Sequence, residues 1–165
     1  MQADIGKVIS VCDREADLYE YLMYKVSHGH RFIVRGGRDK VLEELDETKV
    51  SEVLSESEEL GRYKIKILQK SGRKARVATI GLKTCQVKVK SPRRLEQGEE
   101  ILTLKVVWAY EIKKRGEEQE APLCWVLFTT EPAETFEEAR QLVRYYELRW
   151  KIEEFHKAWK SGAGV

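Results

Sequence analysis

The sequence predicts an α/β fold, because two different patterns of apolar residues follow one another along its 165 residues. In residues 5–37, two apolar runs enclose a helical segment, which is typical of parallel strands joined by a crossover helix. From residue 62 onward, apolar and polar residues alternate with a period of two, which is typical of antiparallel strands with one face in water. We therefore expect an α/β core that is interrupted by an antiparallel insertion.

The first part of the predicted core is a strand–helix–strand unit. The run IGKVISVC, residues 5–12, is expected to form a buried strand with Asp13 at its carboxyl end. A helix with apolar residues at every fourth position should follow it, up to about Gly29. The run RFIVR, residues 31–35, should form the second strand and end at Gly36.

The predicted insertion consists mainly of alternating strands. The alternating segments are residues 62–69, 75–82, 85–90 and 101–112. A further apolar strand is expected at residues 123–130, and Thr135 with Glu138 fits a capping box that opens a final helical region. The chain thus divides into a first core part (1–37), a mainly antiparallel β insertion (38–126) and a return to the core (127–165).

Charge is unevenly distributed along the chain, although the net charge is only +2. Residues 41–60 contain eight acidic side chains and one lysine, whereas residues 62–94 contain twelve lysines or arginines and no acid. Such asymmetry is typical of a basic surface that faces a polyanion, most plausibly a nucleic acid. The alternative is a set of solvated strand faces with no partner.

The chain carries no signal for a membrane or for secretion. None of its apolar runs approaches the length of a membrane span, and no secretory signal opens it. Its three cysteines lack metal-finger spacing, and Cys12 and Cys124 lie in apolar runs, where buried reduced thiols are expected. We therefore expect a cytoplasmic protein without a membrane partner.

The final helical region carries an unusual stripe. Its members follow one another at steps of three, four, four and three residues, which places them on one side of a helix: Tyr146, Arg149, Glu153, Lys157 and Lys160. Together with Asp13, Glu153 would supply the paired carboxylates that suit Mg²⁺, a hard cation that prefers oxygen ligands. The alternatives are a solvated helix face and, for Asp13, a helix N-cap.

Two segments resemble the cut-and-paste DDE transposases of the insertion-sequence-four family: VISVCDREADLYEYL and YYELRWKIEEFHKAWKSGAG. The family signature Tyr-x2-Arg-x3-Glu-x6-Lys is met by Tyr146, Arg149, Glu153 and Lys160. The resemblance implies a ribonuclease-H-like catalytic core with an inserted antiparallel β domain. It also implies cleavage, hairpin formation and strand transfer at transposon ends, with Mg²⁺ as the cofactor and Mn²⁺ as a possible substitute.

The same resemblance assigns roles to individual residues. Asp13 and Glu153 match the second and third catalytic carboxylates and would hold the metal. The residues that would contact DNA phosphates are Arg35, Tyr146, Arg149, Lys157 and Lys160. Trp125 matches a tryptophan on which a flipped base stacks, although it could instead be sheet core, and Trp150 would help to pack the bent DNA end.

One feature of the family pattern has no match in this chain. The first catalytic aspartate belongs on a strand upstream of Asp13, and no residue here corresponds to it. We therefore expect a partial core that does not cleave DNA alone and belongs to a protein that is dimeric on DNA. The alternative function is a non-enzymatic nucleic-acid-binding module that uses the basic face of the β insertion.

Overall fold

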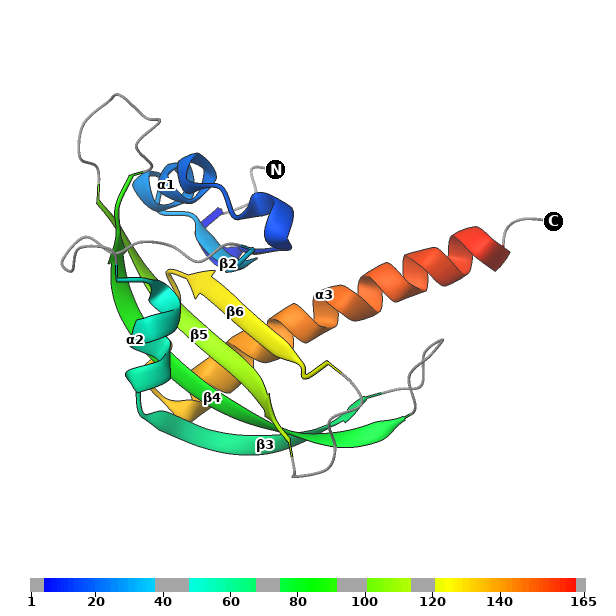
Figure 1. Cartoon of the computed structure of the whole chain (residues 1–165). Coiled ribbons are helices and arrows are strands. Elements are labelled where there is room, and N and C mark those ends of the chain that lie inside the picture. Colours follow the sequence, from blue (N-terminus) through cyan, green and yellow to red (C-terminus); the bar gives the residue numbers. More distant parts are fainter. Residues whose placement is uncertain (1–4, 38–47, 68–74, 92–100, 114–120, 163–165) are drawn as a thin grey trace.

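The computed structural model describes residues 5–37, 48–67, 75–91, 101–113 and 121–162. These residues form one six-stranded sheet with three α-helices, so the protein is a mixed α/β structure (Figure 1). The strands are β1 (Ile9–Cys12), β2 (Arg31–Arg35), β3 (Glu59–Ile67), β4 (Arg76–Val89), β5 (Leu102–Ile112) and β6 (Cys124–Thr129). The helices are α1 (Tyr19–Ser27), α2 (Val50–Glu56) and α3 (Phe136–Gly162), with short 3-10 turns η1 (Ile5–Lys7) and η2 (Arg14–Ala16).

The strand order across the sheet is β1-β2-β6-β5-β4-β3. Strands β1 and β2 are parallel, with Ile9 opposite Arg31 and Cys12 opposite Val34, which confirms the predicted crossover through α1. All other neighbouring strands are antiparallel, as the alternating sequence pattern predicts for β3, β4 and β5. Strands from all three predicted parts of the chain thus pair in one sheet, while the predicted boundaries between those parts remain predictions.

Strand β4 corrects one sequence prediction. The sequence suggested two strands, at residues 75–82 and 85–90, but Arg76–Val89 form one strand that pairs with β5 from Thr79 to Val89. The pattern looks interrupted because the buried face changes along the strand. Ala78, Ile80 and Leu82 pack on the α3 side, whereas Val87 and Val89 pack on the opposite side.

The two faces of the sheet are covered by different helices. Helices α1 and α2 lie over one face, and α3 crosses the other (Figure 1). Adjacent residues of a strand therefore enter different cores, as in β2, where Phe32 and Val34 face α1 and Ile33 faces α3. Because β2 is buried on both faces, all of its central residues are apolar.

Helix α3 begins at the predicted capping box and then leaves the sheet. The Glu138 amide donates to Thr135 Oγ1 at 3.2 Å, and the Thr135 amide donates to Glu138 Oε2 at 3.1 Å, which confirms the capping box. The first half of α3 packs on the sheet, and the rest projects beyond it (Figure 1). Four large apolar side chains are exposed on this projecting half: Leu148, Ile152, Phe155 and Trp159.

The three cysteines are free thiols. Cys12 and Cys85 are half-buried, but Cys124 is exposed, so the expected burial of Cys124 was wrong. Cys124 is the first residue of β6, and the Trp108 indole donates to its sulfur at 3.3 Å. Within the described ranges, no helix is both long enough and apolar enough to span a membrane.

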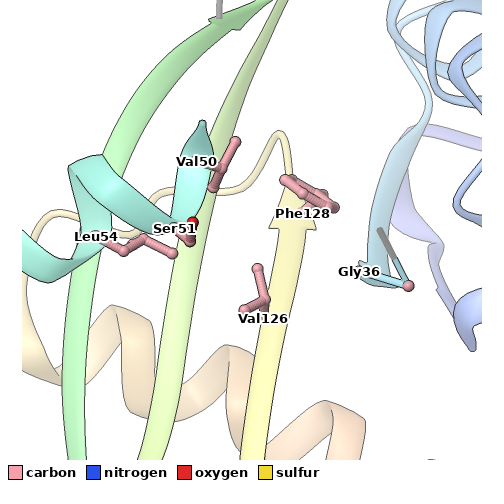
Figure 2. Close-up of a pocket in the computed structure, with 7 residues that line it drawn as sticks. Gly36, Val50, Ser51, Leu54, Val126 and Phe128 are labelled. Atoms are coloured by element: carbon pink, nitrogen blue, oxygen red, sulfur yellow. The ribbon is translucent and has the colours of Figure 1, made fainter. Parts of the chain in front are cut away.

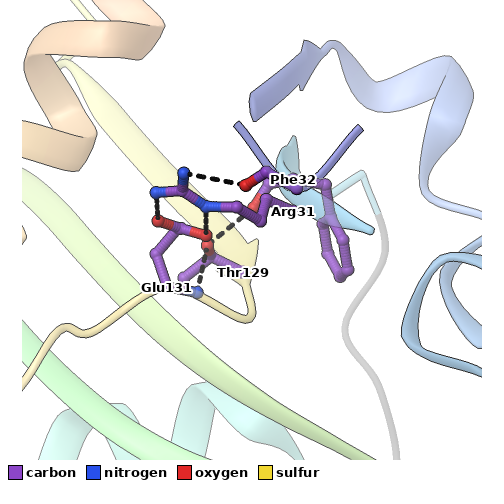
Figure 3. Close-up of polar contacts among 5 residues, drawn as sticks. Arg31, Phe32, Thr129 and Glu131 are labelled. Carbon is purple, nitrogen blue, oxygen red and sulfur yellow. Dashed lines mark hydrogen bonds and ion pairs between the residues drawn. The ribbon is translucent and has the colours of Figure 1, made fainter. Parts of the chain in front are cut away.

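A partly buried ion pair links β2 to the segment that follows β6 (Figure 3). Arg31, the first residue of β2, donates from Nε and Nη2 to the two carboxylate oxygens of Glu131, at 2.9 and 2.5 Å. Thr129 at the end of β6 donates to the Phe32 carbonyl at 2.6 Å and accepts from the Glu131 amide at 3.0 Å. This network lies at the opposite end of β2 from Arg35, so it sets the strand register and leaves the other end available for chemistry.

We expect Glu131→Gln to lower the free energy of unfolding by about 1–3 kcal/mol, because a 7% exposed carboxylate loses its charge-assisted hydrogen bonds. Urea unfolding would measure this loss. The matched control is Glu137→Gln, since Glu137 is an exposed residue of the same region and should change stability by less than about 0.5 kcal/mol. If the two substitutions lower the free energy of unfolding equally, the ion pair between Arg31 and Glu131 does not contribute to stability.

Candidate active site at the end of strand β1

Asp13 follows β1 and starts the turn η2. Its backbone is extended, and its Oδ1 accepts a hydrogen bond from the Arg14 amide at 2.8 Å, so it is the N-cap of η2. The N-cap role that the sequence left open is therefore present. This role uses only one of the two carboxylate oxygens. The second oxygen makes no cap contact, and the side chain is 39% exposed.

Helix α3 brings two residues of the sequence stripe onto Asp13. The Tyr146 hydroxyl donates to Asp13 Oδ1 at 3.2 Å, and Arg149 Nη1 lies 3.6 Å from Asp13 Oδ2. The two residues are three positions apart, so they share one face of the helix. Tyr146 and Arg149 therefore face the carboxyl end of β1, although 133 residues separate Tyr146 from Asp13 along the chain.

Two further predicted site residues surround Tyr146. Arg35 is the last residue of β2, and its Nη1 donates to the Tyr146 hydroxyl at 3.4 Å. Arg35 lies beside Asp13 because β1 and β2 are parallel, which places their carboxyl ends at the same edge of the sheet. Trp125 of β6 packs edge-on against the Tyr146 ring, with ring centroids 5.4 Å apart.

The surroundings favour an ionised Asp13. Partial burial by itself would raise the pKa of this carboxyl group, but the Arg14 amide and the Tyr146 hydroxyl stabilise the charged form. The positive charges of Arg149 and Arg35 act in the same direction, so the pKa of Asp13 lies below its ordinary value. Burial raises the pKa of Tyr146, which keeps its hydroxyl protonated and able to donate.

Not all of the predicted site can be placed. Trp150, Glu153, Lys157 and Lys160 lie in α3, but their side chains fall outside the part of the structure that is described. Glu153 is four residues after Arg149, about one helical turn further along the same face. The predicted proximity of its carboxylate to Asp13 therefore remains a prediction.

Of the two predicted metal ligands, only Asp13 has a described side chain whose suitability for a metal ion can be assessed. Its oxygens are hard donors, its side chain is partly exposed and it is ionised at neutral pH, so it fits as one ligand of Mg²⁺ or Mn²⁺. Among the side chains that the structure describes, no three His, Cys, Asp or Glu residues cluster as a metal site would require. A second carboxylate would have to come from Glu153.

A small cavity lies on the face of the sheet opposite to α3, next to the end of β2. It has a volume of about 260 Å³ and lies between α2, β6 and Gly36–Gly37 (Figure 2). Its lining includes Val50, Leu54 and Phe128 of the core on that face. The described residues that line it carry no charged side chain.

Sequence reasoning missed the burial of Tyr146, whereas the sheet-core alternative that it left open for Trp125 agrees with the structure. Tyr146 is fully buried and Trp125 is only 8% exposed, and both belong to the core under α3. In this form of the protein, Tyr146 holds Asp13 and Arg35 together instead of presenting a free surface to phosphate. The base-stacking role of Trp125 stays a prediction that requires its ring to become accessible.

The fold and the site together define a class of protein. A mixed α/β sheet that places an ionised aspartate at a strand end, beside arginines from a second strand and a distant helix, is typical of metal-dependent phosphoryl-transfer domains. The family description "transposase DDE domain" matches residues 8–165, and the chain therefore belongs to this family. Domains of this family generally use divalent metal ions and act on DNA.

We expect Tyr146→Phe to raise the pKa of Asp13, because the ionised carboxylate loses a donor. A lowered folded-state pKa stabilises the fold above the ordinary value of 3.8, and that stabilisation is lost as the pH falls through the folded-state pKa. The free energy of unfolding of the variant should therefore be lower than that of the parent chain by about 1 kcal/mol near neutral pH, and by less near pH ~2. Urea unfolding at both pH values would measure this difference.

The control is Tyr145→Phe, which removes a hydroxyl from the neighbouring, 36% exposed tyrosine. It should leave the pH dependence of stability unchanged. A carbon-13 NMR titration of the Asp13 carboxyl group would report its pKa directly. An unchanged pKa in Tyr146→Phe would show that the 3.2 Å contact does not stabilise the charged form.

Proposed function

We propose that this chain is part of the catalytic domain of a cut-and-paste DNA transposase of the insertion-sequence-four family, most similar to the transposase of transposon five. The observation that supports this most directly is the convergence on Asp13 of Tyr146 and Arg149, two residues of the family signature. The signature was recognised from spacing along the helix alone, whereas the contact with Asp13 is a separate property of the fold.

Each described residue of the site has a distinct task in this proposal. Asp13 would bind a divalent cation through Oδ2, the oxygen that faces Arg149, while the Arg14 amide and Tyr146 keep its carboxylate oriented through Oδ1. Arg149 and Arg35 provide planar guanidinium groups that can grip the phosphates of the DNA end bidentately. Lys157 and Lys160 would extend this cationic surface along α3, and Glu153 would be the second carboxylate ligand.

When bound, the divalent cation would activate the attacking water or hydroxyl group and stabilise the leaving oxygen in phosphodiester transfer. The residues of this chain would hold the scissile phosphate in place between α3 and the ends of β1 and β2. Trp125 and Trp150 would stack against or pack the distorted DNA end, which offsets the free energy needed to unstack a base.

The proposal of a partial ribonuclease-H-like core is supported by two features of the described residues. Strand β1 forms an edge of the sheet, so one side of its backbone is unpaired there. The projecting half of α3 also exposes a stripe of apolar residues at steps of four, three and four: Leu148, Ile152, Phe155 and Trp159. Further strands beside β1 would both pair with this edge and cover this stripe, and one of them would carry the first catalytic aspartate.

We expect Arg149→Ala, Lys157→Ala and Lys160→Ala to weaken the binding of duplex DNA, whatever its sequence. Each substitution should reduce the slope of log affinity against log salt by about one unit, since one phosphate contact is lost. Arg149→Ala should have the largest effect, because only its guanidinium group can bind a phosphate bidentately. Fluorescence anisotropy at several salt concentrations would measure both the affinity and the slope.

The control variant is Lys151→Ala, which removes an exposed cation of the same helix, about 200° from Arg149 around its axis. This variant should keep the parent affinity and salt slope. If all four variants behave alike, the stripe is a solvated helix face and the proposed DNA-binding role fails.

We expect no strand cleavage by this chain with Mg²⁺ or Mn²⁺, because the matched residues supply two of the three carboxylates that the family uses. Incubation with supercoiled plasmid and analysis of nicked product would test this. Metal-dependent nicking that is abolished by Glu153→Gln would show that the residues present are sufficient for catalysis.

A second function, a non-enzymatic nucleic-acid-binding module, is supported by the exposed face of β3. Arg62, Lys64 and Lys66 are exposed on it, while Tyr63 and Ile65 on the other face pack toward α3. On this alternative, Lys64→Glu with Lys66→Glu would abolish DNA binding, and Arg149→Ala would leave it unchanged.

A further inference from the structure

Asp13 and Arg149 face each other as an ion pair. Arg149 Nη1 lies 3.6 Å from Asp13 Oδ2, yet the proposed function assigns Asp13 to a cation and Arg149 to a phosphate. Each residue therefore occupies the place of the other's ligand. The inference below rests on that proposed function and concerns the order that this contact imposes on binding.

The two oxygens of Asp13 have different surroundings. Oδ1 accepts from the Arg14 amide and from the Tyr146 hydroxyl, so it fixes the orientation of the carboxylate. Oδ2 faces the guanidinium group of Arg149. A divalent cation that approaches Oδ2 is repelled by Arg149, and a phosphate that approaches Arg149 is repelled by Asp13.

The contact is suited to being exchanged. Its 3.6 Å separation is within the range of an ion pair but longer than a hydrogen bond. Arg149 Nη1 is itself buried and makes no hydrogen bond to Asp13, but the two side chains keep 23% and 39% of their surface exposed, so other atoms of each can be reached by a ligand. Tyr146 is fully buried and holds Oδ1 through a hydrogen bond that does not involve Arg149.

We propose that Arg149 exchanges Asp13 for a DNA phosphate when a divalent cation binds Asp13, so that metal and DNA each strengthen the binding of the other. The cation removes the negative charge that holds Arg149 back from the phosphate. The phosphate draws away the positive charge that opposes the cation. By thermodynamic linkage, the two ligands must raise each other's affinity by the same factor.

The first test needs no metal. The affinity for duplex DNA is measured in the presence of a chelator for the parent chain, Asp13→Asn, Arg149→Gln and the double variant. We expect Asp13→Asn to strengthen DNA binding about two- to fivefold, because the negative charge opposite Arg149 Nη1 is removed. This gain should disappear when Arg149→Gln is already present.

A general electrostatic effect predicts a different result. If Asp13→Asn strengthens binding merely by removing a negative charge near DNA, the gain is the same with and without Arg149, and the exchange is overturned. Lys151→Gln serves as the matched background, since Lys151 is an exposed cation of α3 on another side of the helix. In the Lys151→Gln background, Asp13→Asn must still raise the affinity for DNA by the full factor.

The second test titrates Mn²⁺ in the presence and absence of DNA. We expect DNA to raise the Mn²⁺ affinity of the parent chain, and Arg149→Gln to raise it without DNA. Mn²⁺ binding that neither DNA nor Arg149→Gln alters would overturn the exchange while leaving the metal site of the proposed function intact. Absence of Mn²⁺ binding in every variant would overturn both.

Discussion

The pairing of β2 with β6 is the contact on which the rest of the structure depends. It joins the parallel pair β1–β2 to the antiparallel strands β5, β4 and β3. The result is one mixed sheet. The register is held at one end by the bidentate Arg31–Glu131 pair. At the other end, the Gly36 amide donates to the Val126 carbonyl at 2.7 Å, and a Cβ on Gly36 would lie only 2.9 Å from the Phe128 ring.

This register also decides where the candidate site forms. Because β6 is fixed beside β2, Trp125 lies under α3, and α3 starts where Tyr146 can reach across to the ends of β1 and β2. Asp13 and Arg35 meet there because parallel strands end at one edge. The ion pair at the amino end of β2 thus joins structural elements, and the arginine at its carboxyl end contacts Tyr146 of the candidate site.

The site combines a rigid centre with exchangeable charges. Tyr146 is buried and links Asp13 to Arg35, which gives Asp13 a fixed orientation before any ligand arrives. Arg149 approaches the same carboxylate more loosely and is partly exposed. A phosphoryl-transfer site needs both properties, because the carboxylate must be positioned in advance while the cations that hold DNA must be able to follow the substrate.

The sequence by itself determined several of the elements. Local patterns gave the β1–α1–β2 crossover, the Thr135–Glu138 capping box and the alternation of the later strands, and the spacing of Tyr146 and Arg149 placed them on one helix face. The sequence did not reveal that β4 is a single strand, since its buried face changes sides, nor that Tyr146 is a core residue, and it left open whether Trp125 is one. Those properties, and the meeting of Asp13 with Arg149, were decided only by the tertiary structure, because they depend on which distant strand pairs with β2 and where that pairing directs α3.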